Sequence, residues 1–137
     1  MSTPVAAPPF NELQKQMYVA LNGEISASVF DNVPERQSKP WVTIGEVLGT
    51  PDNWHGGFGW NILATVHVWT KSFGFKPALD VAQEIIAILD HQRSALAMPA
   101  SWSVVSIRFE QLQTLRDPDP EIRHVPVQFR IVIHQEV

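Results

Sequence analysis

Apolar residues recur along this chain at two spacings, one typical of helices and one typical of strands. The helical spacing predicts a first helix from Phe10 or Asn11 to about Asn22, where an Asn-Gly pair ends it. It predicts a second helix that begins near Pro77 and ends between residues 91 and 96. The apolar positions that carry these predictions are Leu13, Met17, Val19, Ala20 and Leu21 in the first helix and Leu79, Ala82, Ile85, Ile86 and Leu89 in the second.

Alternating apolar positions predict three strands between the two helices. A short strand contains Val29 and Phe30 and stops before Pro34, which cannot donate to a ladder. The next strand covers 41–48, and Gly45 within it indicates a bulge or a close backbone approach. We expect Val42, Ile44 and Leu48 to share one face of this strand, opposite Trp41, Thr43 and Val47. A third strand covers 61–70.

The rest of the chain has the pattern of a β-hairpin. We expect Val105, Ile107 and Phe109 to share one face of its first strand, and Val127, Phe129, Ile131 and Ile133 to share one face of its second. The proline-rich segment 116–121 between them is a polar turn. The predicted order is therefore α-β-β-β-α-β-β, an α+β fold with a mainly antiparallel sheet of about five strands and a helix packed on one face.

Composition indicates one domain and excludes several kinds of site. With 137 residues, 45% of them hydrophobic, the chain is long enough for one core, and 10–137 is the expected domain behind a flexible proline-containing leader, 1–9. The absence of cysteine excludes disulfides and thiolate chemistry. No signal peptide or apolar run long enough for a membrane span is visible, so we expect a soluble, intracellular protein. The net charge of −4 argues against a protein that grips nucleic acid through its phosphates.

Catalytic and metal-binding motifs are missing from the sequence. None of the five histidines stands at ligand spacing from a second one on a predicted helix, and no acidic cluster accompanies them. The run Gly56-Gly57-Phe58-Gly59 lacks the lysine and the following helix of a phosphate-binding loop. No Gly-x-Ser-x-Gly elbow presents a nucleophile. We therefore expect no catalytic residue, no bound metal and no cofactor.

Large aromatic residues are frequent for a chain of this size and suggest contact with partners. Trp41 and Trp69 are better explained by packing on the sheet. The segment 49–60 holds four glycines, and we expect it to be a long mobile loop that is poorly ordered in a free subunit. A glycine-rich loop buries large rings with difficulty, so Trp54, Phe58 and Trp60 are equally open to packing and to contact with a partner.

Several positions, taken together with the order of elements, resemble the signature of siphophage tail completion proteins. The matching positions are Val29, Asp31, Pro34, Pro40, Gly45, Trp69, Leu89 and Asp117, and the resemblance spans 13–133. Trp41 replaces a different aromatic of the family, and the Asp-Pro-Asp-Pro turn that contains Asp117 and Asp119 replaces an Asp-Gly turn. These departures affect details of the loops.

The resemblance implies a structural, non-enzymatic protein. Copies would form a ring, expected to be a hexamer, at the head-proximal end of the tail tube, where the ring ends tail growth and joins tail to head. Implied partners are the tail tube protein and a head completion or connector protein, with genome DNA passing through without sequence-specific binding. The protein would assemble in the host cytoplasm and remain in a virion or a gene transfer agent. Besides the three aromatic residues, Asp117 and Asp119 are candidate contact residues.

Two alternatives remain at this point. One is a small α+β enzyme or ligand-binding domain that uses His67, His124 or His134 in a pocket. The other keeps the phage setting but makes the protein a neck adaptor on the head side.

Overall fold

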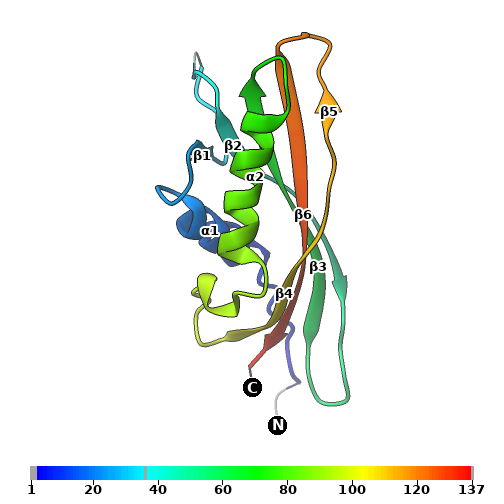
Figure 1. The fold of residues 1–137 in the computed structure, drawn as a ribbon. Coiled ribbons are helices and arrows are strands. Elements are labelled where there is room, and N and C mark those ends of the chain that lie inside the picture. The colour runs from blue at the N-terminus through cyan, green and yellow to red at the C-terminus, as the bar shows by residue number, and fades with distance from the viewer. Residues whose placement is uncertain (1–2, 36, 137) are drawn as a thin grey trace.

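Two helices lie on one face of a single twisted sheet, and no helix of the described residues lies over the opposite face (Figure 1). The computed structural model describes residues 3–35 and 37–136. The elements are α1 (Phe10–Leu21), β1 (Ser28–Phe30), β2 (Trp41–Pro51), β3 (Gly59–Lys71), α2 (Lys76–Leu89), a short 3-10 helix η1 (Arg93–Ala95), β4 (Trp102–Leu112), β5 (Leu115–Arg116) and β6 (Ile122–Gln135). No helix among these is long and apolar enough to cross a membrane.

The sheet confirms the predicted fold class. Its strand order is β1-β2-β3-β6-β4, and the short β5 also pairs with β6. β1 is parallel to β2, whereas every other pairing is antiparallel. The central pair, β3 and β6, keeps one register from Gly59 opposite His134 to Lys71 opposite Ile122. This long, regular pair forms the centre of the sheet.

The core lies between the sheet and the two helices. Alternate residues of β6 face the helices and are buried, which confirms the predicted alternation of this strand. Both helices contribute one apolar stripe, as their spacing predicted, but Val19 of α1 lies outside it and is 57% exposed. The buried side chains are Leu13, Met17 and Leu21 from α1, Ala78, Val81, Ala82, Ile85 and Leu89 from α2, and Val125, Val127, Phe129, Ile131 and Ile133 from β6.

Two β-bulges correct the predicted faces of the outer strands. The register of β2 shifts between Ile44 and Val47, so Gly45 does lie at a bulge, as expected. Because the extra residue reverses the alternation beyond it, Leu48 does not share the buried face and is 63% exposed. In β4 the register shifts between Val104 and Ser106, and Val105 is likewise exposed rather than aligned with buried Ile107.

Two boundaries also differ from the predictions. β2 continues to Pro51 and β3 already begins at Gly59, so the connection between them is much shorter than the predicted loop 49–60. α2 ends at Leu89, before the predicted range, and His91 beyond it has a positive φ of 60°. The backbone N–H of His91 donates to the carbonyl of Ile107 at 2.8 Å. The chain therefore leaves the helix early because this segment is attached to the edge of β4.

Candidate functional site

The five candidate contact residues lie at opposite ends of the molecule. Trp54, Phe58 and Trp60 lie in or beside the β2–β3 turn, near the end of β6 that contains His134. Asp117 and Asp119 lie in the turn before the other end of β6. The 14 residues of β6 separate the two groups by roughly 45 Å at about 3.3 Å per residue. The candidates therefore form two separate surfaces rather than one site.

The β2–β3 turn, residues 52–58, is closed by hydrogen bonds, in place of the long mobile loop predicted over 49–60. The N–H of Asp52 donates to the carbonyl of Gly59 at 2.7 Å, and the N–H of Gly59 donates to Oδ1 of Asn53 at 3.2 Å. Trp54 and Gly57 exchange two backbone hydrogen bonds of 3.2 and 3.1 Å. A turn with this many internal bonds holds its shape within a single subunit.

The glycines of this turn make room for the ring of Trp54. A Cβ atom on Gly57 would lie 2.1 Å from that ring, and one on Gly59 would lie 2.6 Å from the carbonyl oxygen of Asp52. The Trp54 ring also lies against the imidazole of His134, with centroids 4.4 Å apart. Trp54 remains 44% exposed and Phe58 half-buried. Their role in contact with a partner stays a prediction.

Trp60 occupies a different environment from the other two rings. It belongs to β3, opposite Ile133 of β6, and is only 6% exposed. The argument that a glycine-rich loop cannot bury it is wrong because the residue lies in a strand, on the face that the helices cover. Trp60 is therefore a core residue of the free subunit and not an exposed ring.

The turn at the other end uses its carboxylates to hold its own backbone. Oδ1 of Asp117 accepts the N–H of Asp119 at 3.1 Å, and Oδ1 of Asp119 accepts the N–H of Glu121 at 3.0 Å. The buried guanidinium of Arg123 donates to the carbonyls of Pro120, at 2.6 Å, and Phe73. These bonds join the turn to the β3–α2 connection. Asp119 is exposed and Asp117 half-buried at this end, and their contact role also stays a prediction.

A histidine pair lies on the sheet face that no helix covers. Nδ1 of His67 lies 2.6 Å from Nε2 of His124, and Nε2 of His67 lies 2.8 Å from a carboxylate oxygen of Glu46. The ring of Trp69 stacks on His124, with centroids 3.8 Å apart and planes 6° apart. A Cβ atom on Gly45 would lie 2.4 Å from the His67 ring, which explains the glycine at this bulge. The sequence named both histidines among the alternatives but could not pair them, because only the register of β3 with β6 brings them together.

The surroundings of His124 disfavour its charged form. Burial lowers the pKa of His124 below 6.5, and the neighbouring His67 lowers it further, against the opposite effect of Glu46 and Asp117. His134 lies far along β6, beside Trp54. The three histidines therefore do not meet in one pocket. Among the described residues, no group of three or more His, Asp or Glu side chains is placed to hold a metal ion.

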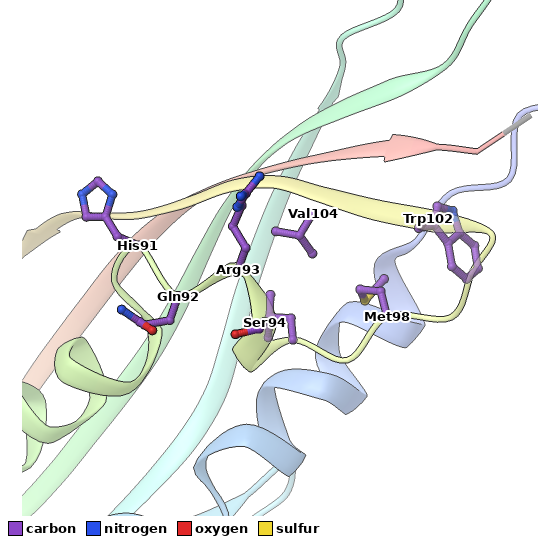
Figure 2. A pocket seen from close by; sticks show the side chains of 8 residues that line it. His91, Gln92, Arg93, Ser94, Met98, Trp102 and Val104 are labelled. Atoms are coloured by element: carbon purple, nitrogen blue, oxygen red, sulfur yellow. The ribbon is translucent and has the colours of Figure 1, made fainter.

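A pocket lies away from these histidines, between η1 and β4 (Figure 2). Its volume is about 470 Å³, and its lining combines apolar side chains with exposed polar ones. It is lined by His91, Gln92, Arg93, Ser94, Leu96, Met98, Trp102 and Val104. None of the residues predicted to contact partners lines it.

Comparison with known families decides the class of protein. The family model described as "Tail completion protein gp17" matches residues 16–134 of this chain. The chain belongs to the tail completion protein family. It is accordingly a structural phage tail protein and not an enzyme, which confirms the resemblance noted in the sequence.

A comparison of structures agrees with the fold. A chain from a structure titled "Virion of native gene transfer agent (GTA) particle" superposes with a TM-score of 0.84 at 19% sequence identity. The match covers 94% of this chain and 99% of that one, so the two chains share the whole fold. No curated protein sequence matches this one.

Proposed function

We propose that copies of this tail completion protein form a ring, a hexamer, at the head-proximal end of the tail tube. The ring stops growth of the tube and offers the surface to which the filled head docks. The observation that supports this proposal is the family match over almost the whole chain. The protein assembles in the host cytoplasm and remains in the tail of a virion or of a gene transfer particle.

The geometry supports contact with two different partners along the tail axis. One end of the subunit carries the turn 52–58 with its exposed Trp54, and the other carries the carboxylate turn of Asp117 and Asp119. Both turns are fixed by internal hydrogen bonds, so each end offers a preformed surface. Two chemically different surfaces on one rigid subunit suit the tail tube protein on one side and a head connector protein on the other.

The charge of the chain suits a ring through which DNA passes. The net charge is −4, with 14 acidic and 10 basic side chains. A mildly acidic ring repels the like-charged phosphates, so the genome slides through without sequence-specific binding.

A tube growth assay tests the proposal. Tail tubes are elongated from purified tube subunits with and without this protein, and tube lengths and ends are examined by electron microscopy. The expected result is short tubes that carry a ring at one end and accept heads. Rings that bind head connectors but leave tube growth unchanged would identify a neck adaptor on the head side instead.

A further inference from the structure

We propose that neighbouring copies in the ring join through the outer edge of β2 in one copy and the groove beside β4 in the next. This inference rests on the proposed ring and names the surfaces that close it. The two surfaces lie on the same chain but at opposite edges of the sheet.

The outer edge of β2 is only partly covered by its neighbour. β1 pairs with Trp41, Val42 and Thr43, and no described strand lies outside the remainder of β2, from Ile44 to Pro51. This uncovered part exposes two large apolar side chains, Leu48 at 63% and Val47 at 36%. An uncovered strand edge with exposed apolar side chains is a surface suited to another chain.

The opposite edge of the sheet carries a groove whose lining can receive the apolar and acidic side chains of the β2 edge. The pocket of about 470 Å³ runs between η1 and the first residues of β4. Figure 2 shows Met98 and Trp102 toward one end of it, His91 toward the other, and Arg93 and Val104 side by side between them. An apolar side chain can enter beside Met98 and Val104 while an acidic group meets Arg93.

The backbone edge of β4 is already occupied in its middle. The carbonyl of Ile107 accepts the N–H of His91 at 2.8 Å, and Oδ1 of Asp90 accepts the N–H of Phe109 at 2.7 Å. A strand from another copy therefore cannot continue the sheet here. The contact is made by side chains in the groove and not by a ladder that runs from copy to copy.

The charges of the two surfaces are complementary. From Trp41 to Phe58 the chain carries Glu46 and Asp52 and no lysine or arginine. From His91 to Arg108 it carries Arg93 and Arg108 and no acidic residue. The side chain of Glu46 is 75% exposed, and both arginines are exposed. Opposite charges at the two surfaces favour contact between different edges and disfavour contact between two like edges.

The position of the two surfaces makes the contact heterologous. β2 and β4 are separated by β3 and β6, so roughly 15 Å of sheet lies between them at about 4.8 Å per strand. Each copy therefore has one surface of each kind, which is the arrangement that repeats by rotation and closes a ring.

Cysteine cross-linking tests the contact, because the chain has no cysteine of its own. Leu48→Cys marks the β2 edge and Ser94→Cys marks the groove, and a short bismaleimide tolerates a modest offset between the two sulfur atoms. The doubly substituted chain is expected to give a ladder of covalent oligomers. A mixture of the two single variants is expected to stop at dimers, and each single variant alone should stay monomeric on a denaturing gel.

Matched variants keep the result interpretable. In the control, Phe73→Cys replaces Leu48→Cys, because Phe73 is 74% exposed and lies outside both surfaces. Combined with Ser94→Cys, it should give no ladder of covalent oligomers. Arg93→Glu should reduce ring formation at least tenfold, whereas Lys76→Glu, at another exposed position, on α2, should leave it unchanged.

The outcomes separate this contact from the proposed function. Cross-linking of Leu48→Cys with itself would show a two-fold contact and overturn the inference. If rings form on tail tubes but the double variant gives no ladder of cross-linked oligomers, the inferred contact is overturned and the proposed ring stands. Unsubstituted protein that neither forms rings nor affects tube growth would overturn both.

Discussion

The two faces of the sheet differ sharply although their residues alternate along the same strands. On the helix-covered face of β3 and β6, from Trp60 to Thr70 and from Arg123 to Ile133, every side chain is apolar except Thr70 and Arg123, and all are at most 6% exposed. The uncovered face carries histidine, tryptophan, arginine and glutamine side chains that are mostly half-buried. The helix-covered face therefore supplies most of the stability of the subunit. The polar side chains of the uncovered face are then free to contact partners.

The largest loss of stability is expected from truncating a fully buried side chain on the helix-covered face. Phe129 is fully buried, and its ring meets that of Phe109 edge to face at 6.2 Å. Phe129→Ala should lower the free energy of unfolding by about 3 to 5 kcal/mol in urea titrations. Leu63→Ala, at a half-buried position on the uncovered face, should cost clearly less. Equal losses would remove the distinction between the faces.

The second-largest loss of stability is expected from removing the buried charge on the helix-covered face. Arg123 is 3% exposed and donates to three backbone carbonyls, those of Phe73, Pro120 and Ile122. Arg123→Ala leaves these carbonyls without their charged donor and should cost about 1.5 to 3 kcal/mol, measured in the same titrations. If the loss is below half a kcal/mol, water replaces the guanidinium and the bonds contribute little.

An ion pair on the uncovered face should contribute less. Arg130 donates to both carboxylate oxygens of Glu110, at 3.1 and 3.2 Å, and both side chains are about one third exposed. Because solvent screens such a pair, Glu110→Gln should lower the free energy of unfolding by less than about 1 kcal/mol. A larger loss would show that this face also carries stability.

The smallest effect is a dependence on pH. The pKa of His124 is lowered in the folded chain, so below 6.5 the unfolded chain binds a proton that the folded chain still resists. The free energy of unfolding should therefore fall as the pH drops through 6.5 and level off below the folded pKa. Thermal melts of a His124→Gln variant should lack this part of the decrease, whereas melts of His55→Gln should retain it.

Regular alternation was enough to predict most of the fold. The helices, the order of elements and the buried face of β6 follow from spacing alone, because each of these segments has one undisturbed period. The outer strands could not be predicted in the same way. Gly45 indicated the bulge in β2 but not that its extra residue moves Leu48 to the surface. No glycine marks the bulge in β4 that leaves Val105 exposed.

The candidate surfaces were predicted less well than the fold. Glycines in 49–60 indicated mobility, yet at Gly57 the missing side chain makes room for Trp54. The groove between η1 and β4 carries no motif, because its lining comes from two segments that only the fold brings together. The family resemblance identified the class of protein without identifying its surfaces.

The bulges in the outer strands also affect how single copies behave before assembly. β2 and β4 both contain register shifts, whereas the central pair of β3 and β6 contains none. Bulges twist a strand and interrupt its ladder, so a foreign strand cannot extend either edge over its full length. Free copies are therefore protected against the fibrous aggregation to which open sheets are prone.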